Sequence, residues 1–99
     1  MFILNQARNT AYNLDNVSRI EVVDDTNEYR KLHPAINDRI YSIKLWFGEK
    51  DAVVIATYTD KVTAECIYRK VIECVANPDI TVVEVPAPVD MDSEYEEKR

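Results

Sequence analysis

The sequence predicts an α+β fold, with an antiparallel sheet of five to six short strands and one long α-helix packed on one face. Apolar and polar residues alternate in several short segments before residue 59, as in half-buried strands. A later segment, 59–77, repeats apolar residues at helical spacing, and one strand-like segment follows it. We expect a single domain over 1–89 and an acidic, disordered tail over 90–99.

Three short strands are expected near the amino terminus, in 2–6, 10–16 and 18–23. Polar residues rich in Asn separate the first two strands, and Asp15 and Asn16 separate the second from the third. Asn and Asp favour turns because their side chains form hydrogen bonds with the nearby backbone.

The clearest strand signal is a β-hairpin over 39–58, with its turn at 48–51. The returning strand, 52–58, is β-branched and apolar, which is typical of a central strand. The first strand alternates between its two faces, with Tyr41, Ile43, Leu45 and Phe47 on one and Ser42, Lys44 and Trp46 on the other.

The segment 24–38 is polar, contains Pro34 and shows no clear period, so we expect a long loop. A short helical turn or a hairpin extension around 29–32 is the alternative. Long loops in compact domains often carry function.

Five residues in and beside this loop are candidates for a binding surface. Tyr, Trp and Arg supply much of the binding energy at protein interfaces, whereas a half-buried aromatic at a sheet edge can also be purely structural. The candidates are Tyr29, Arg30, His33, Tyr41 and Trp46.

The helix within 59–77 is bounded by residues suited to its two ends. Thr59 or Asp60 can cap it by accepting hydrogen bonds from free amide groups of the first turn. Asn77 ends it, because a residue before proline is driven out of the helical conformation. A last strand is expected over 80–85.

The apolar side chains of this helix gather on one side. At 100° per residue they fall within an arc of about 120°, which we expect to pack on the sheet. Charged side chains cluster on the opposite side of the helix. The apolar arc consists of Ala64, Ile67, Tyr68, Val71, Cys74 and Val75.

The two cysteines, Cys66 and Cys74, lie eight residues apart in the helix. They cannot form a disulfide, because this spacing separates their α-carbons by about 12 Å, beyond the limit of about 7 Å. Cys74 is expected to pack as a small hydrophobe. Cys66 lies with Val62 outside the apolar arc, and Ile72 and Ala76 widen that arc, so these four residues are a candidate interface with a second subunit.

Composition argues against several classes of function. With Gly48 as the only glycine, a glycine-rich phosphate loop cannot be built. His33 is the only histidine and no second cysteine pair is present, so we expect no metal site, no cofactor and no catalytic activity. The net charge of −6 disfavours direct binding to nucleic acid and suits a basic protein partner or simple solubility.

We expect a cytoplasmic protein with reduced cysteines. No basic amino-terminal stretch is followed by an apolar run, as it would be in a signal peptide. No apolar run approaches the roughly 20 residues that a membrane-spanning helix needs.

Two segments carry a resemblance to a known group of proteins. Asn13-Leu14-Asp15-Asn16-Val17 forms the first, and the helix start from Tyr58 to Ala64 forms the second. In these segments the chain resembles small uncharacterised proteins carried by low-GC Gram-positive bacteria, their phages and their prophages. The resemblance covers about three quarters of the chain and implies a mobile-element context without a stated activity. The loop 24–38 and the strand after the helix look like additions to that pattern.

The favoured function is that of a non-catalytic binding protein which associates stoichiometrically with a host protein and inhibits or modulates it. A defence factor with a basic nucleic-acid groove is the concrete version, in which acidic residues replace phosphates. One alternative is a homo-oligomer that sequesters a small ligand or signalling nucleotide between subunits. Another is a structural or regulatory protein whose partner the sequence does not identify.

Overall fold

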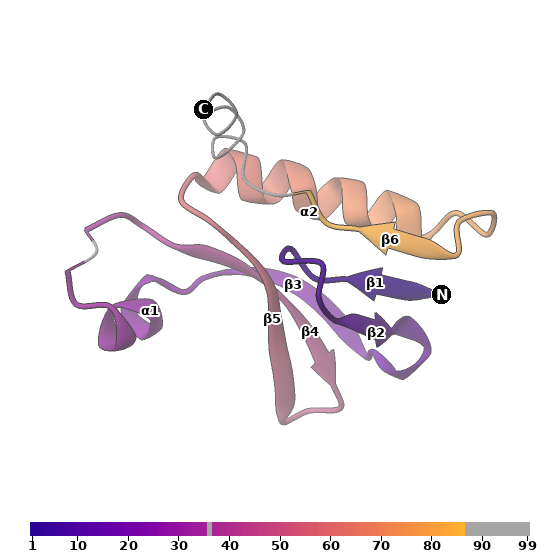
Figure 1. Ribbon diagram of the computed structural model, residues 1–99, viewed down its shortest axis with the longest axis horizontal. Coiled ribbons are helices and arrows are strands. Elements are labelled where there is room, and N and C mark those ends of the chain that lie inside the picture. The colour runs from indigo at the N-terminus through magenta and orange to yellow at the C-terminus, as the bar shows by residue number, and fades with distance from the viewer. Residues whose placement is uncertain (36, 87–99) are drawn as a thin grey trace.

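A computed structural model describes residues 1–35 and 37–86, and it shows a mixed α+β fold (Figure 1). The predicted class is therefore confirmed, while the predicted acidic tail, 90–99, lies outside the described residues. The elements are β1 (Phe2–Leu4), β2 (Ala11–Asn13), the 3-10 helix η1 (Leu14–Asn16), β3 (Arg19–Asp24), α1 (Thr26–Leu32), β4 (Tyr41–Phe47), β5 (Asp51–Tyr58), α2 (Lys61–Val75) and β6 (Val82–Glu84).

The described strands form two three-stranded sheets, so the prediction of one antiparallel sheet was wrong. The larger sheet has the order β3-β4-β5 and is antiparallel throughout. The smaller has the order β2-β1-β6, and its β1–β6 pair is parallel. Alternation along a strand specifies which face is buried but not which strand lies beside it, and for this reason the sequence did not reveal the division.

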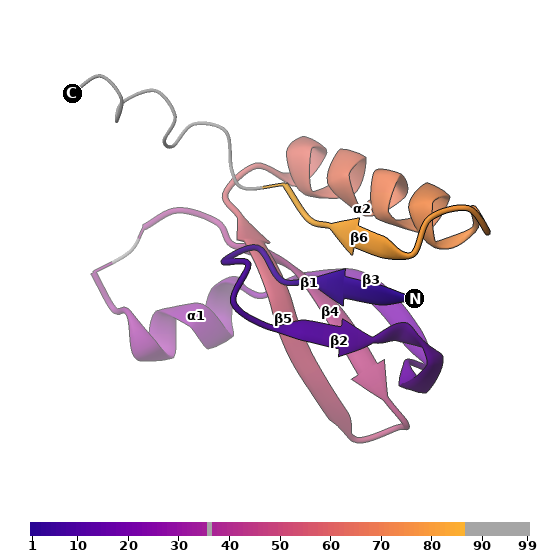
Figure 2. The same cartoon turned by 45° about the vertical axis from the view of Figure 1, so that its right-hand side comes forward.

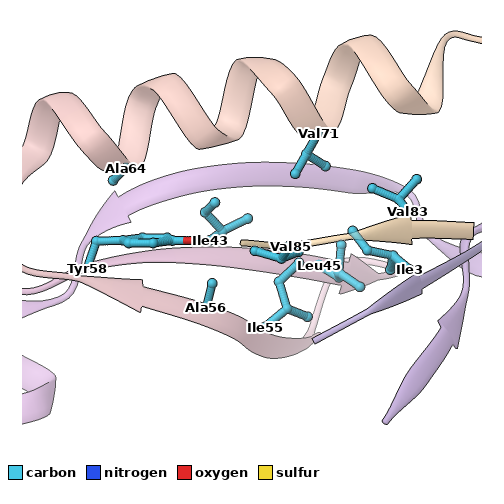
Figure 3. Packing of buried hydrophobic residues seen from close by; sticks show 10 residues of the cluster. All are labelled: Ile3, Ile43, Leu45, Ile55, Ala56, Tyr58, Ala64, Val71, Val83 and Val85. Carbon is cyan, nitrogen blue, oxygen red and sulfur yellow. The ribbon is translucent and has the colours of Figure 1, made fainter. Parts of the chain in front are cut away.

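The helix α2 lies along one side of both sheets (Figures 1 and 2). The strand β6 runs beside it, next to β1, while α1 sits apart from α2 at one end of the larger sheet. The two sheets and α2 share one buried core, in which Ala64 and Val71 point from α2 towards the strands (Figure 3). The buried residues of this core are Ile3, Ile43, Leu45, Ile55, Ala56, Tyr58, Ala64, Val71, Val83 and Val85.

The predicted helix is confirmed as α2, with Asp60 as its N-cap. The carboxylate of Asp60 accepts hydrogen bonds from the Thr63 hydroxyl at 2.7 Å and from the Thr63 amide at 2.9 Å. Both bonds lower the pKa of Asp60 below its ordinary value, and the bond from the hydroxyl has the larger effect. All six residues of the predicted apolar arc belong to the core or pack against it.

The end of β5 is anchored by Tyr58, which is buried beneath α2 near Ala64 (Figure 3). Its hydroxyl donates to the carbonyl oxygen of Pro86 at 2.8 Å and so holds the chain that follows β6. Burial raises the pKa of Tyr58 to about 12, because the phenolate would lose its hydration.

The prediction of a long loop over 24–38 was wrong, because seven of its residues form α1. The alternative of a short helical turn around 29–32 is confirmed, and the helix begins three residues earlier. A local network sets the start of this helix. The Asp24 carboxylate accepts from the Thr26 amide at 3.1 Å and from the Thr26 hydroxyl at 2.5 Å. The Thr26 hydroxyl in turn accepts from the amide of Ile40 at 3.0 Å, which brings the two ends of the segment together. Hydrogen bonds of this kind leave no periodic pattern in the sequence.

The two sheets are joined by Gln6, which leaves β1 and pairs with the edge of β5. Its backbone amide donates to the carbonyl oxygen of Ile55 at 2.7 Å. Its side-chain amide donates to the carbonyl oxygen of Thr57 at 3.2 Å and accepts from the Thr57 amide at 3.0 Å. The side chain therefore bonds to Thr57 in the way that a neighbouring strand would. We call these three hydrogen bonds the Gln6 clasp.

We expect the substitution Gln6→Ala to lower the free energy of unfolding by about 2 kcal/mol, because it leaves the partly buried amide and carbonyl of Thr57 without partners. Urea unfolding followed by circular dichroism measures this change. The matched control is Ala7→Ser, a substitution at the exposed neighbouring position. Equal unfolding midpoints for the two variants would show that the two side-chain bonds of the clasp contribute nothing to stability.

Candidate binding surface

The face of the larger sheet that points away from the core is here named the outer face. Ile43 and Leu45 enter the core, so the alternate residues of β4 and their cross-strand neighbours lie on the other side. The outer face consists of Arg19, Glu21 and Val23 from β3, Ser42, Lys44 and Trp46 from β4, and Ala52, Val54 and Thr57 from β5.

At one end of the outer face, Arg19, Glu21 and Trp46 form a group that we call the Trp46 cluster. The guanidinium carbon of Arg19 lies 4.5 Å from the Trp46 ring centroid, a distance suited to a cation–π contact. The indole Nε1 of Trp46 donates to Oε2 of Glu21 at 2.8 Å, and Nε of Arg19 lies 3.6 Å from Oε1 of Glu21. Each side chain is held by the other two.

The surroundings of the Trp46 cluster are open to solvent and partly apolar. Ala52, directly opposite Trp46 on β5, is exposed, and Val54 is 44% exposed. The adjoining β4–β5 turn carries the exposed carboxylate of Glu49, and the exposed carboxylate of Asp51 follows at the start of β5. An aromatic side chain flanked by exposed apolar and acidic groups is suited to contact with a basic macromolecule.

The other end of the outer face is occupied by a polar network with a structural role. The Ser42 hydroxyl donates to Oδ2 of Asp25 at 3.0 Å, and Nζ of Lys44 lies 3.6 Å from Oδ1 of Asp25. The side chains of Lys44 and Asp25 are only 23% and 15% exposed, so each charge has lost much of its hydration and is stabilised by the opposite charge beside it. This network fixes the start of α1 against β4.

The candidate binding residues named from the sequence do not form one site. Tyr29 and His33 stack on α1, with ring centroids 4.5 Å apart, and Arg30 beside them donates to the carbonyl oxygen of Asn37 at 2.8 Å. Tyr41 and Trp46 lie near opposite ends of β4, on opposite faces of the sheet. Only Trp46 belongs to the outer face. Binding roles for the other four stay predictions.

The four candidate interface residues on α2 are partly to fully open to solvent. Val62 is 72% exposed and Ile72 is 38% exposed, and Cys66 and Ala76 are also exposed. Val62 and Ile72 are ten residues apart, or about 15 Å along the helix axis. The charged residue Arg69 lies on the helix surface between Val62 and Ile72, so these two apolar side chains do not merge into one patch. Their role in an interface stays a prediction.

A surface hollow of about 240 Å³ lies between β3, the start of β4 and the first turns of α2. Its lining residues are Val22, Val23, Asp24, Tyr41, Lys61 and Glu65. Of these, sequence reasoning had singled out only Tyr41, because a contact between the start of α2 and the edge of β3 has no local signature.

One carboxylate of this hollow is held in its charged form. The pKa of Asp24 lies below its ordinary value, chiefly because its carboxylate accepts a hydrogen bond from the Thr26 hydroxyl. The Thr26 amide and the guanidinium of Arg39 lower the pKa further. Nη1 of Arg39 lies 3.1 Å from Oδ2 of Asp24. The carboxylate on the β3 side of the hollow is therefore part of an ion pair with Arg39.

Over residues 1–35 and 37–86, no group of three or more His, Cys, Asp and Glu side chains is placed to hold a metal ion. No helix in the same residues is long and apolar enough to cross a membrane. Comparison of the chain with protein-family models, with curated proteins and with solved structures gave no match.

We expect Cys66 to react with a disulfide reagent on the order of tenfold faster than Cys74 in the folded protein, because the first thiol is exposed and the second is partly buried. Absorbance of the released thiolate resolves the two phases, and the substitution Cys66→Ser removes the fast one. A slow Cys66 phase that quickens on dilution would instead show that a second copy covers this face of α2.

We expect Asp24 to stabilise the folded protein at neutral pH and to lose this effect in acid. Its folded-state pKa is lowered, so the unfolded chain takes up the proton first as the pH falls below the ordinary value of about 4. The urea midpoint of Asp24→Asn should therefore lie below that of the wild type at pH 7 and approach it near pH 2.5. The exposed Asp38→Asn variant is the control, and a gap that stays constant with pH would contradict the expectation.

Proposed function

We propose that the protein is a non-catalytic binding protein that acts by stoichiometric association with another protein, and that the outer face is its docking surface. The observation that carries the proposal is the Trp46 cluster. Trp and Arg are the side chains that most often dominate binding energy at interfaces. In this cluster, Arg19 and Glu21 already hold the Trp46 ring in place, so little side-chain freedom is lost on binding.

The charge of the chain favours a basic partner. The net charge is −6, and residues 49–51, in the β4–β5 turn and at the start of β5, comprise two acidic side chains and one basic one. A protein with a basic nucleic-acid groove offers the complementary surface, with carboxylates of this chain in place of phosphates. The resemblance to proteins of bacterial mobile elements suggests a host defence factor as the concrete target, which the association would inhibit.

The experiment begins with the immobilised full chain and a nuclease-treated lysate of a low-GC Gram-positive bacterium. Retained proteins are purified separately and mixed with the chain, and light scattering at 0.05 M and 0.5 M salt gives the mass of each complex. We expect a complex of fixed stoichiometry that weakens steeply with salt, because screening reduces the attraction between exposed charges. The purified partner should also lose its affinity for duplex DNA when the chain is added.

We expect Trp46→Ala to weaken this complex by about 30-fold, as for a central interface residue. Arg19→Ala tests the same cluster with less risk to the fold, and urea unfolding checks both variants. The control is Val82→Ala, at an exposed position of β6 in the smaller sheet. If every retained protein binds Trp46→Ala as tightly as the wild type, or if no protein is retained, the proposed docking surface is wrong.

A further inference from the structure

We propose that the free edge of β3 accepts an extended basic segment of the partner as a fourth strand of the larger sheet. This inference rests on the proposed function and adds to it the mode of contact and the chemistry of the segment. It concerns the edge of β3 and the hollow beside it, which are distinct from the Trp46 cluster.

The outward main-chain groups of β3 follow from its pairing with β4. The Asp25 amide donates to the carbonyl oxygen of Ile40 at 2.8 Å, which extends the ladder between the two strands by one pair. In an antiparallel ladder, alternate residues point both main-chain groups towards the neighbour, and the residues between them point both away. Ile20, Val22 and Asp24 are therefore the residues whose main-chain groups face the open edge.

A contact with α2 confirms this direction and limits the length of the edge. The hydroxyl of Tyr68 donates to the carbonyl oxygen of Ile20 at 3.2 Å, so this oxygen points away from β4 and has a partner. The open stretch begins after Ile20 and is centred on Val22. Exposed strand edges usually carry charges that hinder random pairing, and Arg19 and Asp24 fulfil this role at the two ends of β3.

The hollow beside this stretch is suited to one side chain of an added strand. Its volume of about 240 Å³ lies below the range of roughly 300–1,000 Å³ typical of small-molecule pockets. It is lined on one side by Val22 and Asp24 of β3 and on the other by Lys61 and Glu65 of α2. In peptide recognition by strand addition, main-chain hydrogen bonds provide affinity and a neighbouring pocket selects a side chain.

The charges select a basic occupant. Asp24 and Glu65 place two carboxylates on the hollow, beside the ammonium group of Lys61. Arg39 already pairs with Asp24 at 3.1 Å, whereas Glu65 forms no ion pair within the described residues. A second copy of this chain would bring another net charge of −6 to the same edge, and the acidic sequence of 90–99 has the same sign. A Lys or Arg side chain from another protein has the opposite charge and can pair with the carboxylate of Glu65.

The test uses the full chain labelled with ¹⁵N and a twelve-residue probe peptide that alternates Lys or Arg with Val or Thr. We expect the Val22 and Asp24 amide signals to shift on titration, together with those of Lys61 and Glu65. The same peptide with N-methyl groups on alternate amides cannot donate to the strand, and it should bind about tenfold more weakly. A peptide of the same pattern with Glu in place of the basic residues should not bind.

The substitution Glu65→Lys should weaken binding of the basic peptide by about tenfold, since it reverses one charge at the hollow. The matched control is Glu73→Lys, which makes the same change on α2 two turns away and should leave the affinity unchanged. Both positions are at least partly exposed, so neither change should prevent folding.

The outcomes separate this inference from the proposed function. Shifts confined to the outer face, equal binding of the N-methylated peptide, or no binding at all would overturn the strand addition and leave the test with Trp46→Ala unaffected. A dimer in light scattering whose Val22 amide is protected from hydrogen exchange without peptide would show that the occupant is a second copy, which also overturns it. Loss of the Trp46→Ala effect with intact peptide binding would overturn only the proposed docking surface.

Discussion

The Gln6 clasp is the constraint on which the arrangement of the two sheets depends. Within the described part of the chain neither sheet has more than three strands, and small sheets of this kind need a covering layer to be stable. The clasp joins β5 to the chain that leaves β1, so that both sheets present their apolar residues to α2. Because the clasp turns the apolar face of the larger sheet towards α2, its outer face is free to carry the Trp46 cluster.

The parts of the fold that follow local patterns could be predicted from the sequence. The hairpin of β4 and β5 and the helix α2 with its Asp60 cap appear where alternation, periodicity and turn chemistry placed them. The β1–β6 pair could not be predicted, because three-residue strands contain too few residues to specify a partner. The sequence offered α1 only as an alternative, a short turn around 29–32, because the start of the helix is set by Thr26, whose partner Ile40 is fourteen residues away.

The candidate site was predictable only in its side-chain types. Trp46 was named from its chemistry and from its position opposite the apolar face of its strand. Its partners Arg19 and Glu21 required the register between β3 and β4, which no local pattern reveals. The hollow beside β3 joins residues about forty positions apart, so the meeting of Asp24 with Lys61 and Glu65 emerges only in the folded chain.

The hydrogen bonds that close the segment 25–40 at its base affect how the sequence of this protein can evolve. Asp25 and Ile40 are hydrogen-bonded to each other, and Thr26 bonds to the same residue, so the chain between them leaves and re-enters the sheet at one point. Lengthening a surface excursion of this kind costs little entropy, since the cost grows only with the logarithm of its length. Mutation and insertion within 27–39 can therefore alter the surface that other molecules meet while the sheet keeps its geometry. This segment is therefore suited to rapid sequence diversification, as expected for a protein that evolves together with a binding partner.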